Sequence, residues 1–316
     1  LNGSLGAELK AGEYAQISID GGKSWIDVDV SGTSWTWVDT RKLDDGDYNY
    51  QLRVIDDAGN ISATTNKVVT VDTVAPTPTL TVDSISDDTG VDNRDFITRD
   101  TTLTIHGSLT TALTEGEFVQ ISLDGGTSWQ NVTMVGASWY FTDGRTLEEG
   151  DHDYWVRVVD TAGNVGNTIK QTVTVDLTPP DDSLTVSIDS ISDDTGYSNS
   201  DFLTNDTSLT IHGSLGRPLG DGEYVQISVD NGINWVYVSV VGDEWSYEDT
   251  RVLKDGENTY QVRVIDKAGN VGQTAEQVVT IDTTPPTNIA TIVNYTDDVG
   301  SDRGTFGSGT VTDDRT

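Results

Sequence analysis

Pairs of adjacent carboxylates in glycine-bearing loops are the residues of this 316-residue sequence best suited to chemistry. One pair lies in Ser84–Gly90, which reads SISDDTG, and the same letters recur at Ser190–Gly196. A looser copy, YTDDVG, occupies Tyr295–Gly300. Two neighbouring carboxylates repel each other unless a cation lies between them. Ca²⁺ is bound by several hard oxygen ligands of this kind, so the pattern predicts calcium sites.

The expected order of the strands brings further carboxylates to the same place. In a sandwich of about seven alternating strands, the loop after the first strand lies at the end where the last strand finishes. The candidate ligands are Asp87, Asp88, Asp95 and Asp176 in one set, Asp193, Asp194, Asp201 and Asp282 in the next, and Asp297 and Asp298 in a third. Asp100 and Asp206 belong to the same end, and the following domain would add a loop with Asp266 and Asn270. The alternative is that these aspartates only cap turns and keep the chain soluble.

Other motifs with a chemical appearance have simpler explanations. Ser18–Trp25, SIDGGKSW, resembles the Asp-box hairpin of sialidases, whose Asp accepts turn amides while the Trp packs beneath it. We expect a structural hairpin here and in its copies. Asp27–Gly32 begins like an EF-hand loop, but Val38 stands where that loop needs a glutamate. The three histidines form no pattern with a nucleophile, so no enzyme active site is expected.

Aromatic pairs raise a second hypothesis, a glycan-binding surface. The pairs are Trp35 and Trp37, Trp139 and Tyr140, and Trp245 and Tyr247. Strand alternation predicts that one member of each pair faces the core and that the other is partly exposed. Exposed members could stack on sugars, so a glycan-binding module is the alternative function.

Charge and composition narrow the class of partner. Lys and Arg number 18 against 52 Asp and Glu, a net charge of −34, which disfavours nucleic acid and anionic membrane surfaces. The chain has no cysteine, so disulfides and thiolate metal sites are excluded. No apolar run is long enough to cross a membrane as a helix. A small secreted domain without disulfides needs another source of stability, and a bound metal ion is one candidate.

A repeat of about 105 residues organises the whole chain. Arg53–Asn60, RVIDDAGN, recurs at Arg157–Asn164 and Arg263–Asn270, at spacings of 104 and 106 residues. The same spacings relate Trp25, Trp129 and Trp235, and also Gly3, Gly107 and Gly213. Self-similarity at a fixed period is the signature of a repeat architecture.

Each repeat is predicted to be all-β. In Tyr50–Val54 apolar residues alternate with polar ones, which indicates a half-buried strand. Proline-bearing segments end the last strands and mark the joints. We expect tandem immunoglobulin-like β-sandwich domains in an elongated rod. Their predicted bounds are residues 1–75, which lack the first strand, 76–179, 180–285, and 286–316, the start of a further repeat. The tail strand of one molecule could then complete the first repeat of another.

These motifs resemble the bacterial Ig-like repeats of giant type I-secreted adhesins, such as the large non-fimbrial Salmonella adhesin and related RTX-type adhesins. The resemblance rests on Asp-Ala-Gly-Asn, on the Val-Asp-Thr-x-x-Pro domain ends and on Ser-Ile-Ser-Asp-Asp-Thr-Gly. It implies a calcium-stiffened stalk that is secreted to the bacterial cell surface and helps attachment to host cells or other surfaces. The implied partners are a host-cell or glycan receptor, which can lie outside this segment, and the neighbouring repeats. Nucleic acid and membrane insertion are not expected.

Overall fold

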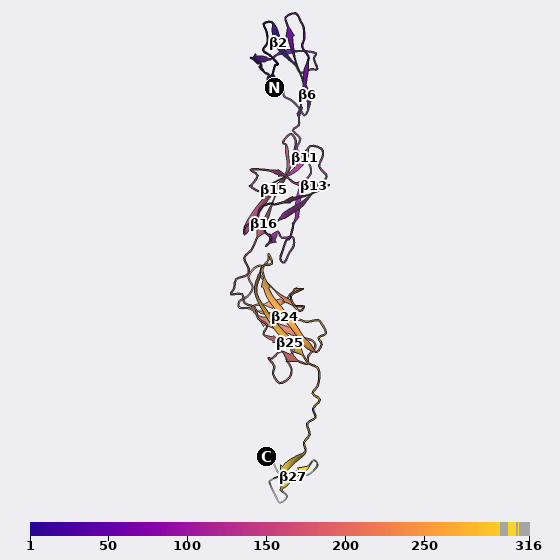
Figure 1. Cartoon of the computed structure of the whole chain (residues 1–316), viewed down its shortest axis with the longest axis vertical. Helices are drawn as coiled ribbons and strands as arrows, with labels where there is room; N and C mark the ends of the chain where they lie inside the picture. Colours follow the sequence, from indigo (N-terminus) through magenta and orange to yellow (C-terminus); the bar gives the residue numbers. More distant parts are fainter. Residues whose placement is uncertain (298–302, 308, 310–316) are drawn as a thin grey trace. The chain divides into compact units, whose positions relative to one another are not determined.

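The structure is a computed structural model that describes residues 1–297, 303–307 and 309 (Figure 1), apart from the side chains of Tyr295, Asp297 and Phe306. Every regular element in this part of the chain is a β-strand or an isolated bridge, which confirms the all-β prediction. Among these residues, no helix is long and apolar enough to span a membrane. Leu1–Pro179 and Asp266–Asn270 form one compact unit, and Pro180–Ile265 and Val271–Thr316 form the other.

The first sandwich pairs a small sheet of order β1-β5-β4 with a sheet of order β3-β2-β6-β7. Its strands are β1 (Asn2–Ser4), β2 (Glu13–Ser18), β3 (Ile26–Asp27), β4 (Asp29–Ser31), β5 (Ser34–Thr36), β6 (Gly46–Asp56) and β7 (Thr65–Val71). Its buried apolar core is small and consists of Ala15, Ile17, Val28 and Tyr50.

The second sandwich has larger sheets, ordered β13-β14-β10-β8 and β12-β11-β15-β16-β9. Its strands are β8 (Leu80–Ile85), β9 (Ile97–Thr98), β10 (Thr104–Leu109), β11 (Glu117–Ser122), β12 (Gln130–Asn131), β13 (Thr133–Val135), β14 (Ser138–Thr142), β15 (Gly150–Asp160) and β16 (Val165–Val175). The short strand β9 runs parallel to the end of β16, with Ile97 opposite Thr174.

The third sandwich repeats this plan with sheets β17-β19-β23-β22 and β18-β25-β24-β20-β21. Its strands are β17 (Ser190–Ile191), β18 (Leu203–Thr204), β19 (Thr210–Ser214), β20 (Tyr224–Ser228), β21 (Val236–Tyr237), β22 (Ser239–Val241), β23 (Glu244–Glu248), β24 (Gly256–Ile265) and β25 (Val271–Ile281). A hairpin of β26 (Asn294–Asp297) and β27 (Gly304–Gly307) follows.

Strand alternation builds each core. In β15 the side chains of Tyr154, Val156 and Val158 are fully buried, whereas Trp155 and Arg157 between them are half-buried on the other face. The buried set packs against side chains of the opposite sheet, such as Ile105 and Trp139. Burying a side chain of this size stabilises the fold by about 1.5–3 kcal/mol. The predicted period-two pattern is therefore confirmed as the source of the core.

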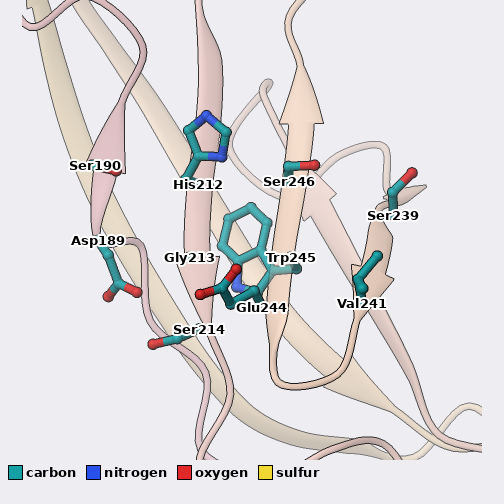
Figure 2. Close-up of a pocket in the computed structure, with 10 residues that line it drawn as sticks. All are labelled: Asp189, Ser190, His212, Gly213, Ser214, Ser239, Val241, Glu244, Trp245 and Ser246. Carbon is teal, nitrogen blue, oxygen red and sulfur yellow. The ribbon is translucent and has the colours of Figure 1, made fainter.

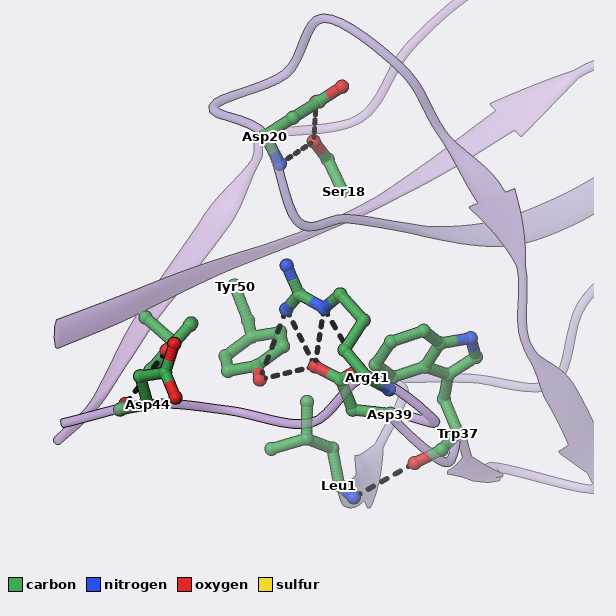
Figure 3. A network of polar contacts seen from close by, with 9 residues as sticks. Leu1, Ser18, Asp20, Trp37, Asp39, Arg41, Asp44 and Tyr50 are labelled. Carbon is green, nitrogen blue, oxygen red and sulfur yellow. Dashed lines mark hydrogen bonds and ion pairs between the residues drawn. The ribbon is translucent and has the colours of Figure 1, made fainter. Parts of the chain in front are cut away.

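A buried polar network fixes one edge of each core. In the second sandwich Asp143 receives hydrogen bonds from Tyr154 Oη at 2.9 Å and from Arg145 Nη2 at 2.7 Å. Burial alone would raise the pKa of Asp143, but the hydrogen bonds from Arg145 and Tyr154 outweigh burial and lower it. Figure 3 shows the counterpart in the first sandwich, where Arg41 and Tyr50 converge on Asp39.

Candidate functional site

Two equivalent acidic loops, residues 86–96 and 192–202, precede β9 and β18. In the first loop, Asp87 has a φ of 48° and Phe96 a φ of 61°. Their counterparts Asp193 and Phe202 have φ values of 47° and 60°. This left-handed conformation is uncommon for a bulky residue and costs about 1–3 kcal/mol. Because the same strained backbone recurs, the contacts around each loop must hold it in place.

Hydrogen bonds within the acidic loop supply those contacts. Thr98 Oγ1 donates to the carbonyl oxygen of Asp87 at 2.7 Å. The backbone amide of Phe96 donates to Asp88 Oδ2 at 3.2 Å, and the amide of Ile97 donates to Asp95 Oδ1 at 3.0 Å. The second loop repeats the three bonds, from Thr204 to Asp193, Phe202 to Asp194 and Leu203 to Asp201.

One carboxylate oxygen in each acidic loop is left without a partner. Asp88 Oδ1 and its counterpart Asp194 Oδ1 are buried, and neither has a hydrogen-bond partner in the protein. Burial raises the pKa of Asp88, and the nearby carboxylates of Asp95 and Asp92 raise it further, against the opposing Phe96 hydrogen bond. A buried carboxylate oxygen is costly unless a donor or a cation satisfies it. The orphaned oxygen is therefore the feature of this loop that best fits a cation.

The last strand of each sandwich brings a further aspartate to the loop. The amide of Asp176, just beyond β16, donates to the carbonyl oxygen of Thr98 at 2.9 Å, and Asp282 makes the same bond to Thr204. Asp87 and Asp176 thus contact the same residue, Thr98, from two sides. The loop after the first strand does lie at the end where the last strand finishes.

The predicted ligands are not gathered into one cluster. Within residues 1–297, 303–307 and 309, no group of three or more His, Cys, Asp or Glu side chains is placed to hold a metal ion. The side chains of Asp87 and Asp95 are exposed, whereas Asp88 is half-buried. Of the third predicted set, Asp298 and the side chain of Asp297 lie outside the described residues.

An asparagine caps the strand end from the next repeat. Within the first compact unit, Asn164 Nδ2 donates to the carbonyl oxygen of Asp72 at 3.0 Å and to Asp160 Oδ2 at 2.9 Å. In the same unit, Asn270 Nδ2 donates to the carbonyl oxygen of Asp176 at 2.9 Å. The Asn of the Asp-Ala-Gly-Asn motif therefore satisfies the final carbonyl of the preceding strand.

The Asp-box hairpin has the structural role expected of it. In the second copy Asp124 Oδ1 accepts the Ser128 amide at 2.8 Å, and Asp124 Oδ2 accepts the Ser128 hydroxyl at 2.6 Å. These bonds, with that of Ser122, lower the pKa of Asp124 to about 2. Trp129 donates to the Gly126 carbonyl, and Arg157 stacks 4.0 Å above the centre of its ring.

The aromatic pairs divide between core and surface. Trp139 is 1% and Trp245 2% exposed, so neither indole can stack on a sugar, whereas Tyr140 is 38% exposed. The strand alternation predicted for the aromatic pairs is confirmed for Trp139 and Tyr140. Trp245 and Tyr247 are two residues apart in β23 (Glu244–Glu248) and so lie on one face, and the half-buried Tyr247 packs against the core. Trp35 and Trp37 of the first sandwich are both half-buried.

A surface pocket of about 420 Å³ lies on the third sandwich beside Trp245. In Figure 2, His212 stands on the central strand β19, with Asp189 on one side of it and Glu244 on the neighbouring strand β23.

Two sets of residues were not anticipated from the sequence. One is the Asp-Arg-Tyr network, although its signal was present: Asp39, Asp143 and Asp249 recur at the repeat spacing, each with Arg two residues later and Tyr eleven residues later. The other is the left-handed pair Phe96 and Phe202. Nothing in the sequence marks an aromatic residue for that conformation.

Comparison with known proteins identifies the fold. Three segments, residues 5–73, 74–177 and 183–283, match the family described as Bacterial Ig-like domain. The sequence has no match among curated proteins. The FN1–FN3 domains of chicken CNTN1 share 14% identity with the chain, over 85% of it and 90% of that structure, with a TM-score of 0.33. The fibronectin(III)-like modules of Clostridium thermocellum CbhA share 17% identity over 64% of this chain and 93% of that one, with a TM-score of 0.35.

A third structure, SGBP-B of the Bacteroides ovatus mixed-linkage glucan utilization locus in complex with a mixed-linkage heptasaccharide, shares 17% identity. The match covers 89% of this chain and 63% of that structure, with a TM-score of 0.19. Likeness at such identities concerns the fold alone. Bacterial Ig-like domains occur in extracellular proteins of bacterial surfaces and are typically structural modules. Since the three matched segments span most of the sequence, the chain belongs to the bacterial Ig-like domain family.

Proposed function

We propose that this chain is a calcium-stiffened stalk segment of a secreted bacterial surface adhesin. The observation that carries the proposal is the orphaned oxygen of Asp88, which recurs as Asp194 in an equivalent loop. Each lies in an acidic loop that the aspartate after the last strand also contacts through a shared threonine. A cation bound there would neutralise the repulsion between the loop carboxylates and satisfy the buried oxygen.

The residues present fit calcium better than a softer metal. Their side chains are carboxylates, and backbone carbonyls and water can supply the remaining oxygens that Ca²⁺ takes. Asp88 and Asp194 would hold the ion, with Asp87, Asp95 and Asp176, and Asp193, Asp201 and Asp282, as the candidates for the remaining ligands. Asp297 and Asp298 would serve a further repeat. Affinity is expected to be weak, with a Kd on the order of 10⁻⁴ to 10⁻³ M, as in other extracellular modules.

Stiffening follows from where the loop lies. Within the first compact unit, the acidic loop of residues 86–96 lies beside the strand end at Asp176, whose carbonyl oxygen accepts a hydrogen bond from Asn270 Nδ2. An interface of that size rarely fixes an angle by itself. A cation next to such a strand end would couple the loop to the joint and limit its bending.

The test compares the chain in calcium, in chelator and with the pair Asp193→Ala and Asp194→Ala. A matched control, Asp243→Ala with Glu244→Ala, removes the same charge from two exposed residues of the same sandwich, the end of a turn and the first residue of β23. Calcium should raise the melting temperature of the parent and of the control. At a calcium concentration 100-fold above Kd, one occupied site should increase the free energy of unfolding by about 2.7 kcal/mol. It should also increase the maximum dimension seen in X-ray scattering. If all samples had the same melting temperature and the same maximum dimension, the carboxylates would serve only to keep the chain soluble.

The adhesive part of the proposal concerns the receptor. A stalk spaces the receptor-binding region from the cell, and the host-cell or glycan receptor would be held by other parts of the protein. Beads coated with this segment should then show no more attachment to host cells than uncoated beads. Calcium-dependent attachment, lost when Tyr140 and Tyr247 are changed to Ala, would instead favour a glycan-binding module.

A further inference from the structure

The outer face of the four-stranded sheet in the third sandwich is hollowed by a row of small residues. The pocket of about 420 Å³ described above is lined there by Ser190, His212, Ser246 and Ser239. Ser190 lies opposite His212, which lies opposite Ser246. Ser246 in turn lies opposite Ser239 on β22. One row across the sheet therefore carries three serines around a single histidine.

The second sandwich shows what a larger residue does at this place. Its row has the same register, with His106 opposite Ser84 on one side and Tyr140 on the other. The rings of Tyr140 and His106 lie side by side, with their centroids 6.2 Å apart. Ser246 is the counterpart of Tyr140, 106 residues later, and leaves that place open. The hollow is thus a property of the third repeat and not of the fold.

The deepest part of the pocket is held in a fixed position. Its buried lining residues are Gly213 and Trp245. Trp245 Nε1 donates to the carbonyl oxygen of Ser187 at 3.1 Å, whereas Nε1 of the equivalent Trp139 is buried without a partner. A site that is already ordered loses less free energy on binding than one that must become ordered. The anchored indole therefore favours binding in the third sandwich.

The walls of the pocket present hydrogen-bonding groups of both kinds. In Figure 2 the carboxylates of Asp189 and Glu244 lie on the same side of the sheet as the His212 ring. Among the residues that the structure describes, these three side chains and the hydroxyls of the three serines have no hydrogen-bond or ion-pair partner. A carboxylate only accepts, whereas a serine hydroxyl and a neutral imidazole both donate and accept. The pocket therefore suits a ligand that does both.

We propose that this pocket binds one uncharged sugar unit. The hydroxyls of a sugar ring would donate to Asp189 and Glu244 and would accept from His212 and the serines. Val241, which also lines the pocket and is 82% exposed, would contact C–H groups of the ring. Pockets for small molecules have volumes of about 300–1,000 Å³, and this pocket lies within that range.

Two other classes of ligand match the pocket less well. An anionic sugar would be repelled by Asp189 and Glu244, and by the net charge of −34 on the chain. The ammonium or guanidinium group of a partner protein would pair with the two carboxylates. Such a group has donors only, so the donors of the serines and of His212 would stay unused. An uncharged sugar matches the whole set of polar groups.

The expected affinity is weak because the pocket is open and holds one ring. We expect a Kd on the order of 1 mM. One site of this strength does not hold a cell, so the receptor-binding region of the proposed stalk remains in other parts of the protein. The inference does not rest on calcium or on the proposed function. It is tested in chelator, so that the failure of one leaves the other standing.

The test uses a substitution that the second sandwich already carries. Ser246→Tyr introduces the residue found at Tyr140, so the fold should tolerate it while the ring fills the pocket. Thr274→Tyr is the matched control, because it adds the same ring at an exposed position of β25 in the other sheet. Glu244→Gln removes one carboxylate from an exposed position and serves as the second variant if Ser246→Tyr melts earlier than the control.

The measurement is a titration followed by amide chemical shifts in NMR. The probes are the methyl glycosides of glucose, galactose, mannose and N-acetylglucosamine. At least one should shift the amides of residues 212–214 and 244–246 in the parent and in Thr274→Tyr. The Kd should rise at least about tenfold in Ser246→Tyr and several-fold in Glu244→Gln.

Three results would overturn the proposal. The first is that none of the four sugars shifts these amides at concentrations well above the expected Kd. The second is that Ser246→Tyr, with a melting temperature equal to that of the control, binds the sugar as tightly as the parent. The third is tighter binding of N-acetylneuraminic acid or of Nα-acetyl-lysine methylamide, which would assign the pocket to an anionic sugar or to a basic side chain.

Discussion

The hydroxyl of Tyr154 donates a hydrogen bond of 2.9 Å to Oδ2 of Asp143, and both residues are buried in the second sandwich. The same relationship joins Tyr260 to Asp249 at 2.6 Å. Each carboxylate is also held by an arginine two residues later in the sequence, whose guanidinium stays partly exposed. The network therefore ties the loop after β14 or β23 to the long strand that crosses the core.

Tyr154→Phe removes the hydroxyl and leaves the Asp143 carboxylate with one fewer donor. Losing a hydrogen bond to a charged group costs about 1.5–3 kcal/mol. The second sandwich should therefore melt earlier in calorimetry. Tyr140→Phe, at a residue that is 38% exposed, is the matched control and should leave the transition unchanged. A Tyr154→Phe protein as stable as the control would show that the arginine alone satisfies the carboxylate.

Acid should weaken the fold through the carboxylates whose pKa is lowered. Hydrogen bonds from Ser128 and Ser122 lower the pKa of Asp124 to about 2, whereas the pKa of an aspartate in the unfolded chain is about 3.9. The unfolded state thus binds more protons between these values. The stability from Asp124 is complete above about pH 4 and is lost as the pH falls towards about 2. Melting followed from pH 7 to pH 2 should show this loss, and Asp124→Asn should flatten it.

The stacked arginine on the hairpin tryptophan should not tolerate lysine. Arg157 stacks 4.0 Å from the ring centre of Trp129 while its Nε and Nη2 donate to Gln120 Oε1 at 3.1 and 2.9 Å. Lysine cannot present a flat face and a two-pronged donor together. We expect Arg157→Lys to destabilise the second sandwich by about 1 kcal/mol. Arg94→Lys, at an exposed position, should have no effect in the same urea titration.

Much of the fold could be predicted because the strand alternation and the local turn chemistry of the sequence both indicate the same β-sandwich. Strand alternation such as that of Tyr154, Val156 and Val158 appears directly as buried side chains. The hairpin role of Asp124 also follows from local chemistry, since its partners lie within four residues.

The candidate site was less predictable because its geometry is set by distant contacts. The sequence indicated that Asp88 belongs to an acidic loop, but it could not show which oxygen would be buried without a partner. Which oxygen is left over depends on Phe96, whose backbone amide donates a hydrogen bond to Asp88 Oδ2. Phe96 itself has a left-handed backbone conformation. Residue type alone does not predict such a conformation for phenylalanine.

Asp88→Asn should have opposite effects with and without calcium. Without the ion, the buried carboxylate has one oxygen unsatisfied, so a neutral amide should leave the second sandwich equally or more stable. With calcium, the variant loses a charged ligand, so the ion should stabilise it less than it stabilises the parent. Melting curves recorded in chelator and in calcium measure these two effects separately. A variant that gains as much from calcium as the parent would show that Asp88 does not hold the ion.

The last prediction concerns the glycine that lies between the first strand and the buried indole. In the second sandwich a Cβ on Gly107 would clash with both the Thr81 carbonyl oxygen and the ring of Trp139. The carbonyl belongs to backbone, so relief requires β8 to move off the sheet. We expect Gly107→Ala to cost about 1–3 kcal/mol or more. Gly144→Ala, where a Cβ meets no atom within 4 Å, should cost far less. Hydrogen exchange on β8 should rise in the first variant alone, and unchanged exchange there would mean that Trp139 yields instead of the strand.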